Sequence, residues 1–155
     1  MTHELLRYLH VIGACVLLGT GAGIAFFMLV SNRSRDPALI AHVSGIVVLA
    51  DTVFTTTAAI LQPLTGVLLA RQAGFPLLEG WVLVSLLLYL LVGACWLPVV
   101  WIQIRMQRLA TAARDAGTPL PAAYDRLFRI WFALGVPAFL AVLAILWLML
   151  TKPAL

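Results

Sequence analysis

Four long apolar stretches, separated by short polar breaks, account for almost the whole chain. They cover about residues 5–30, 43–70, 81–104 and 127–150. A hydrocarbon core about 30 Å thick needs roughly 20 mostly apolar residues per helical crossing, so each stretch is long enough to span a membrane. The breaks, such as SNRSRDP and RDAGTPLPAAYD, contain the Gly, Pro, Asp and Ser that are typical of turns. The pattern predicts an all-α protein, an antiparallel four-helix transmembrane bundle that forms a single domain over residues 1–155.

The composition agrees with a membrane protein. Hydrophobic residues make up 63% of the chain and charged residues 10%, whereas soluble domains have roughly 45 to 50% and about 25%. We therefore expect a multi-pass protein of the bacterial inner membrane, with no soluble catalytic domain left over. Cys15 and Cys95 both lie inside apolar stretches, where a thiol usually packs as a small hydrophobe, so we expect no structural disulfide.

The basic residues are distributed unevenly between the two ends of such a bundle. One end has only Arg7, Arg71 and Lys152. The other end has seven arginines: Arg33, Arg35, Arg105, Arg108, Arg114, Arg126 and Arg129. Lys and Arg in short loops favour the cytoplasm, which predicts that both chain termini lie on the non-cytoplasmic side. Topology and contact with lipid headgroups account for this basic face, and no nucleic-acid partner is expected.

Polar side chains inside the apolar stretches recur at helical spacing. In the second stretch, Asp51 and Gln62 fall within about 20° of one another at 100° per residue. The other stretches have similar lines: His3, His10, Ala14, Leu17 and Gly21; Ser85, Tyr89, Trp96 and Gln103; and Trp131, Gly135, Ala138 and Met149. Because a polar group is costly in hydrocarbon, we predict that each helix turns one semi-polar face towards a shared internal cavity or cofactor slot.

Asp51 is the polar residue that is hardest to explain by packing alone. It lies well inside its stretch, and no Lys or Arg lies at a comparable depth. An ionised carboxylate would need a partner there, which favours a bound proton over a bare charge. Two interpretations stay open: Asp51 and Gln62 serve a proton or a polar ligand, or they make structural hydrogen bonds between helices.

His10 lies a few residues inside the first stretch, with Gly13 and Ala14 one turn further on. An imidazole in a membrane helix can bind metal or haem, carry protons, or hydrogen-bond a neighbour. Haem b also accounts for the small residues, because a porphyrin face needs space beside its ligand, and Arg7 can pair with a propionate. Copper is a weaker alternative, because Cys15 lies about 140° around the helix from His10. A structural histidine is an equal alternative.

The spacing restricts the second ligand of such a haem. His42 begins the second stretch at the opposite end of the bundle, on the order of 25 Å or more from His10, so one haem cannot bridge them. The haem would be five-coordinate, ligated across a dimer, or completed by a group such as Met149, with Tyr89 and Trp96 lining the slot. The chain has no H-E-x-x-H, G-x-S-x-G, Walker or CxxC motif, so the sequence does not decide whether it is an enzyme.

Several segments carry a resemblance to known families. LLRYLHVIGACVLLGTGAGIAFF, ADTVFTTTAAILQPLTG, WLPVVWIQIRMQRLA and FRIWFALGVPAFLAVLAILW resemble an uncharacterised family of four-helix bacterial integral membrane proteins. The start YLHVIGACVLLGTG more distantly resembles the first helix of the HemJ-type protoporphyrinogen IX oxidases and the CopD-type copper-resistance proteins. In the HemJ type this histidine is associated with haem, which implies that role for His10. That family has a lysine early in its third helix where this chain has Ser85, so oxidase activity is not implied.

Two functions follow as hypotheses. The first is a membrane-embedded, haem-b-binding redox protein of the HemJ/CopD-like type, with His10 as axial ligand and Arg7, Gly13, Tyr89, Trp96 and Met149 around the cofactor. The second is a non-enzymatic accessory subunit or a small proton or solute transporter that uses the stripe of Asp51 and Gln62. In either case we expect contact with the lipid bilayer and assembly as a homo-oligomer or within a larger membrane complex.

Overall fold

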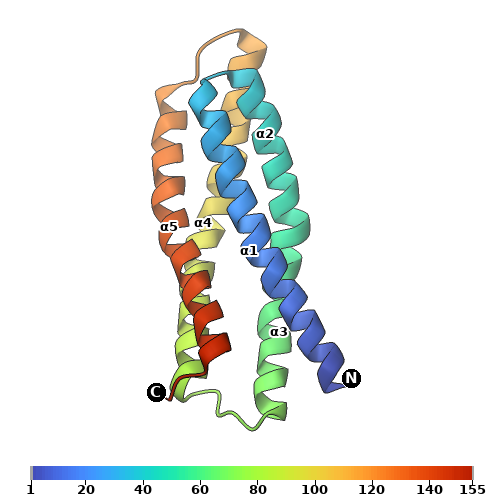
Figure 1. The fold of residues 1–155 in the computed structure, drawn as a ribbon. Coiled ribbons are helices and arrows are strands. Elements are labelled where there is room, and N and C mark those ends of the chain that lie inside the picture. Colours follow the sequence, from blue (N-terminus) through green and yellow to red (C-terminus); the bar gives the residue numbers. More distant parts are fainter. Residues whose placement is uncertain (1, 155) are drawn as a thin grey trace.

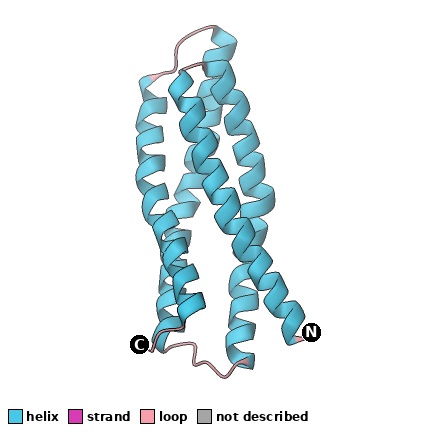
Figure 2. Cartoon of the chain, in the orientation of Figure 1, coloured by secondary structure: helices cyan, strands magenta, loops and turns pink. Residues whose placement is uncertain are grey.

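The computed structural model describes residues 2–154 and confirms the four-helix bundle (Figure 1). The elements are α1 (His3–Ser34), α2 (Pro37–Ala50), a π-helical turn η1 (Asp51–Thr55), α3 (Thr56–Gln72), α4 (Gly80–Ala116) and α5 (Ala122–Thr151). Since α2, η1 and α3 are continuous, they form one span, and all four spans are long and apolar enough to cross a membrane. The described residues contain no strand (Figure 2). The start of α1 and the end of α5 lie at the same end of the bundle, which we call the terminal end.

The helices extend beyond the predicted apolar stretches because turn signals end them rather than a loss of hydrophobicity. Asp36 caps α2 by accepting a hydrogen bond from the backbone N–H of Ala38 at 2.9 Å. Gly117 ends α4 in the left-handed conformation, with φ +63°, which glycine adopts without steric cost. At 1.5 Å per residue the 37 residues of α4 measure about 55 Å. Its last turns therefore project beyond a hydrocarbon core of about 30 Å.

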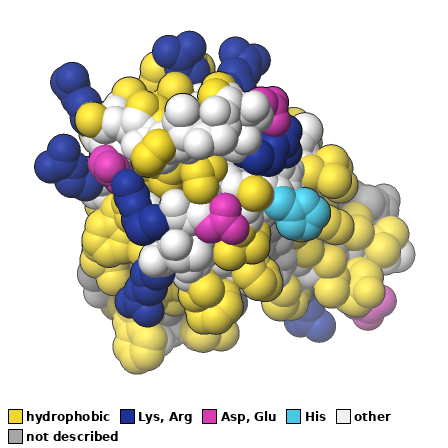
Figure 3. Space-filling model, turned by 90° about the horizontal axis from the view of Figure 1, so that it is seen from above, with side chains coloured by type: hydrophobic (Ala, Val, Ile, Leu, Met, Phe, Trp, Pro, Cys, Tyr) yellow, Lys and Arg dark blue, Asp and Glu magenta, His cyan; other side chains and the backbone are white. Residues whose placement is uncertain are grey.

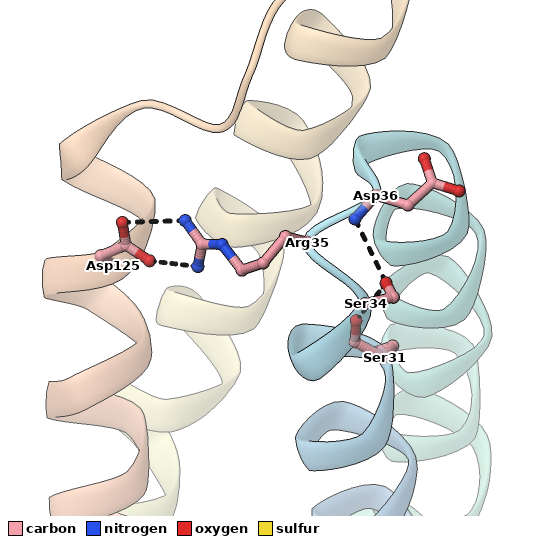
Figure 4. Close-up of polar contacts among 5 residues, drawn as sticks. All are labelled: Ser31, Ser34, Arg35, Asp36 and Asp125. Atoms are coloured by element: carbon pink, nitrogen blue, oxygen red, sulfur yellow. Dashed lines mark hydrogen bonds and ion pairs between the residues drawn. The ribbon is translucent and has the colours of Figure 1, made fainter.

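Arginines gather at the end of the bundle opposite the terminal end, which we call the arginine end (Figure 3). There Arg35 donates two hydrogen bonds to the Asp125 carboxylate, at 2.6 and 3.1 Å, and joins the α1–α2 turn to the start of α5 (Figure 4). These hydrogen bonds raise the pKa of Arg35 above its usual value. Because the side chains are 50% and 44% exposed, the ion pair contributes at most about 1 kcal/mol.

The bundle is packed differently in its two halves. A continuous apolar core fills the half towards the arginine end, and it includes Ile24, Met28, Ile40, Val47, Ile102, Met106, Tyr124 and Trp131. In the half towards the terminal end the buried residues are mostly small or polar, such as Gly13, Ala58, Gln62, Thr65, Ser85 and Ala141. There the α1–α3 pair diverges from the α4–α5 pair (Figure 1). The large apolar contacts that hold the spans together are therefore concentrated at the arginine end.

One hydrogen bond compensates for a proline inside α3. Pro63 has no N–H, so the carbonyl of Ala59, four residues earlier, loses its helical partner. The hydroxyl of Tyr89 on α4 donates to this carbonyl. A membrane helix tolerates proline where a neighbour satisfies the freed carbonyl in this way. Tyr89 thereby joins α3 to α4 in the less tightly packed half.

Candidate functional site

Asp51 lies where the second span changes from α-helix to π-helical turn. The backbone N–H of Thr56 bonds to the carbonyl of Asp51, five residues earlier. The hydroxyls of Thr52, Thr56 and Thr57 donate back to carbonyls of the preceding turn at 2.6 to 3.1 Å. Thr55 differs from them, because its hydroxyl is buried and hydrogen-bonds to no described residue. Such π-turns are rare and are frequent at functional sites.

Asp51 is 3% exposed and is hydrogen-bonded by two side chains of α4, one of which is bonded in turn by a side chain of α5. The indole N–H of Trp96 donates to Asp51 Oδ1 at 3.2 Å. In the amide orientation that satisfies its neighbours, Gln103 donates from Nε2 to Asp51 Oδ2 at 2.8 Å and accepts at Oε1 from Trp131 Nε1 at 3.3 Å. We call Asp51, Trp96, Gln103 and Trp131 the Asp51 cluster. It connects the second, third and fourth spans.

The Asp51 cluster has no counter-charge. Both ion pairs in residues 2–154, Arg35 with Asp125 and Arg114 with Asp115, lie near the arginine end. The groups that donate to Asp51 are neutral N–H donors. A buried carboxylate without a cation is costly. A proton or a cationic ligand at Asp51 would remove that cost.

His10 packs against α3 in a defined orientation. Thr65 Oγ1 lies 2.8 Å from the Leu61 carbonyl and 2.8 Å from His10 Nδ1, and when its one hydroxyl hydrogen is donated to the carbonyl, Oγ1 accepts from Nδ1. The proton of the neutral imidazole therefore lies on Nδ1, and Nε2 keeps its lone pair. Gly66 makes room for the ring, because a Cβ there would lie 3.0 Å from His10 Cε1.

Gln62 lies between the Asp51 cluster and His10 along the span. Its side chain lies beside Gly13, where an added Cβ would be 3.4 Å from Gln62 Cδ. Gln62 Oε1 is buried and accepts from no donor within the described part of the chain. Asp51, Thr55, Gln62 and Thr65 are all buried, so the polar stripe of the second span faces inwards as its spacing predicts.

The residues predicted to surround a haem make the following contacts in the structure. They are His10, Arg7, Gly13, Tyr89, Trp96 and Met149. Tyr89 bonds to a backbone carbonyl and Trp96 to Asp51, while His10 and Gly13 pack on α3. Arg7 is exposed and Met149 is half-buried near the end of α5. His10 Nε2 could hold a haem iron, and the other predicted residues contact α3, Asp51 or the ends of their helices.

The other candidate ligands are also separated. His42 is exposed on α2, towards the arginine end. Cys15 is exposed on α1, whereas Cys95 is buried in α4. Over residues 2–154, no three or more His, Cys, Asp or Glu side chains are grouped so that they could hold a metal ion.

The structure adds partners that sequence reasoning did not identify. Gln103 and Trp131 were on predicted inward faces, but nothing in the sequence shows that they meet Asp51. Thr65 is not among the predicted site residues, although it follows Gln62 by three residues and so lies on the same face of the helix. Thr55 follows Asp51 by four residues and so lies on the same face of the helix, but its difference from the neighbouring threonines depends on the π-turn.

Comparison with known proteins identifies a family. Residues 4–153 match the family described as predicted integral membrane protein (DUF2269). No curated protein and no solved structure matches the chain. The comparisons thus support an integral membrane family, and they do not extend to the HemJ-type or CopD-type proteins.

Proposed function

The chain belongs to the predicted integral membrane protein family DUF2269, and we propose that it is a small membrane transporter that conducts protons, with Asp51 as the group that carries the proton. The observation that carries the proposal is a buried carboxyl whose hydrogen-bond donors are two neutral side chains of the third span, Trp96 and Gln103. Intramembrane carboxyls of this kind are typical of proton pathways. Because arginines in short loops favour the cytoplasmic side, the arginine end faces the cytoplasm.

The contacts of Asp51 allow it to gain and lose a proton without rebuilding the bundle. As a carboxylate, Asp51 accepts hydrogen bonds from Trp96 and Gln103. As a neutral acid it gains an O–H, which needs an acceptor. The Thr55 hydroxyl is one turn further along the inward face and has no partner. Thr55 would accept from the protonated form, and Trp96 and Gln103 would stabilise the ionised form.

Proton flux into vesicles tests this proposal. The protein is reconstituted in lipid vesicles that contain a pH-sensitive dye, and a membrane potential is imposed. We expect Asp51→Asn to reduce the protein-dependent flux by about 100-fold or more, because the amide cannot exchange a proton. Asp115→Asn is the matched control, since Asp115 is exposed and pairs with Arg114, and it should conduct as the wild type does. Equal flux in wild type and Asp51→Asn, or no flux above that of protein-free vesicles, would contradict the proposal.

Haem-b binding at His10 is a second candidate function, favoured by the tautomer that Thr65 selects. Metal-ligating histidines usually donate their other ring N–H to a fixed acceptor, as His10 Nδ1 does. Bound haem would supply one-electron redox chemistry, with His10 Nε2 as its axial ligand. Copper at the same nitrogen is the weaker form of this proposal.

An absorption spectrum tests the second candidate. After haem supplementation and purification in detergent, we expect a Soret band in the wild type that His10→Ala removes. His3→Ala is the control, because His3 is exposed and contacts Gln72 at the end of the same helix pair. If the wild type shows no Soret band, or if His10→Ala leaves it unchanged, haem ligation by His10 is wrong.

A further inference from the structure

We infer that, in the conformation of this structure, Asp51 exchanges its proton with the terminal end of the bundle only, along a path formed by Thr55, Gln62 and His10, and that the bundle must open on the other side of Asp51 for the proton to reach the arginine end. The inference rests on the proposed function of Asp51. It adds the route of the proton and the side from which the site is reached.

Buried polar groups without partners mark the path. Thr55 and Gln62 are each 8% exposed, and their side-chain oxygens Oγ1 and Oε1 have no hydrogen-bond partner among the described residues. Buried polar atoms in proteins are nearly always hydrogen-bonded, either by protein or by ordered water. Both residues follow Asp51 on the inward face, about 6 and 16 Å along the helix axis. Water bound at these oxygens would extend from Asp51 towards His10.

His10 provides the last acceptor of the path. It contacts Thr65, which is about 21 Å beyond Asp51 along the span at 1.5 Å per residue. Its Nε2 lone pair is left free by the hydrogen bond from Nδ1 to Thr65. The ring is only partly buried, so it lies between the interior and the terminal end.

The terminal half of the bundle presents little apolar bulk that would oppose water. The buried residues of this half include the small residues Gly13, Ala58, Ser85 and Ala141, and its larger buried side chains, Leu6, Val82 and Leu148, lie towards the helix ends. The two helix pairs also diverge in this half (Figure 1). Hydration of the unpartnered oxygens therefore requires no displacement of a large apolar core.

On the other side of Asp51 an apolar layer closes the bundle. Met28, Ile40 and Met106 have no exposed surface, and they pack in one core with Val47 and Ile102. Ser44 lies on the same stripe as Asp51, but its hydroxyl already donates to the Ile40 carbonyl at 2.6 Å.

Two further unpartnered polar atoms lie in Asn32 and Tyr124. Both residues are close to the ends of their helices at the arginine end. The apolar layer separates them from Asp51, so they offer the proton no continuous route.

Each step transfers a proton between acceptors and needs no oxidant or reductant. Neutral Asp51 releases its proton to water bound beside Thr55 and becomes a carboxylate that Trp96 and Gln103 stabilise. Water beside Gln62 passes the proton to His10 Nε2, which becomes an imidazolium. The imidazolium returns to its neutral form by releasing a proton to water at the terminal end.

The accessibility of single cysteines tests the route. In a Cys15→Ser, Cys95→Ser background, Ala58→Cys places a thiol on the path and Val47→Cys places one in the apolar layer. The two positions are similarly buried, at 4% and 3% exposure, so they are matched. We expect a small charged methanethiosulfonate added from the terminal end to modify Ala58→Cys about tenfold faster than Val47→Cys, because only hydrated thiols form the reactive thiolate. The same reagent added from the arginine end should modify neither.

The outcomes separate the route from the function. If Ala58→Cys is unreactive from the terminal end, or if Val47→Cys reacts as fast, the one-sided path is wrong. In that case Asp51→Asn would still abolish proton flux if the proposed function is right. A circular dichroism spectrum and an unfolding curve like those of the background protein confirm that each cysteine variant is folded. His10→Leu is a second test of the route. An apolar side chain at the terminal end of the path should slow the modification of Ala58→Cys.

Discussion

Gln103→Leu should lower the free energy of unfolding by about 2 to 3 kcal/mol, because the leucine leaves two buried groups without a partner. Gln103 is 1% exposed, and its amide donates to Asp51 and accepts from the Trp131 indole. Leucine fills a similar volume, so the decrease in the free energy of unfolding comes mainly from the lost hydrogen bonds and not from a change in packing. Reversible unfolding in mixed detergent micelles measures the change.

Gln107→Leu is the matched control for this substitution. Gln107 lies one turn further along α4, is half-buried, and makes no side-chain hydrogen bond to another described residue. We expect a change within about 0.5 kcal/mol there. In the Gln103→Leu protein, a further Asp51→Leu substitution should recover part of the lost stability, since it removes the carboxyl that was left unsatisfied. Equal effects of the two glutamine substitutions would show that Gln103 does not join Asp51 to Trp131.

Gly66→Leu should lower the free energy of unfolding by about 2 to 3 kcal/mol, because the leucine overpacks the contact between α1 and α3. Even a methyl group at residue 66 would come within 3.0 Å of the His10 ring. The ring is held by its hydrogen bond to Thr65, so it cannot move aside without losing that bond. The same unfolding experiment measures the effect.

Gly19→Leu is the control for the glycine substitution. Gly19 lies on the same helix as His10, is exposed, and has no atom within 4 Å of an added Cβ. Leucine there should be neutral or slightly stabilising, because glycine disfavours helices by about 1 kcal/mol. His10→Ala should make Gly66→Leu better tolerated. If Gly66→Leu and Gly19→Leu are alike, His10 is not packed against α3.

The architecture could be predicted from the sequence because membrane insertion depends on local properties. The lengths of the apolar stretches and the turn residues between them predicted four antiparallel spans. The inward direction of Asp51 and Gln62 also followed from the sequence, since eleven residues make about three turns. Helix ends were predicted less well, because α4 continues as a helix for twelve residues past the apolar stretch that was expected to end at residue 104.

The partners within the site could not be predicted, because they depend on how the spans pair and rotate. The proximity of Trp96 to Asp51 and of Gln103 to Trp131 requires the second, third and fourth spans to meet at one depth. The hydrogen bond of Tyr89 to the carbonyl freed by Pro63 likewise depends on how α3 and α4 pair. Hydropathy does not predict the π-turn at Asp51. The threonines in and after this turn donate hydrogen bonds to backbone carbonyls of the preceding turn.

The claim that Asp51 carries a proton inside the bundle is tested most directly by infrared spectroscopy of the protein in lipid at neutral pH. We predict a carbonyl stretching band of a protonated, buried carboxyl that is present in the wild type and in Asp115→Asn and is absent in Asp51→Asn. If the wild type and Asp51→Asn differ only in bands of an ionised carboxylate, Asp51 is not protonated and the claim is contradicted.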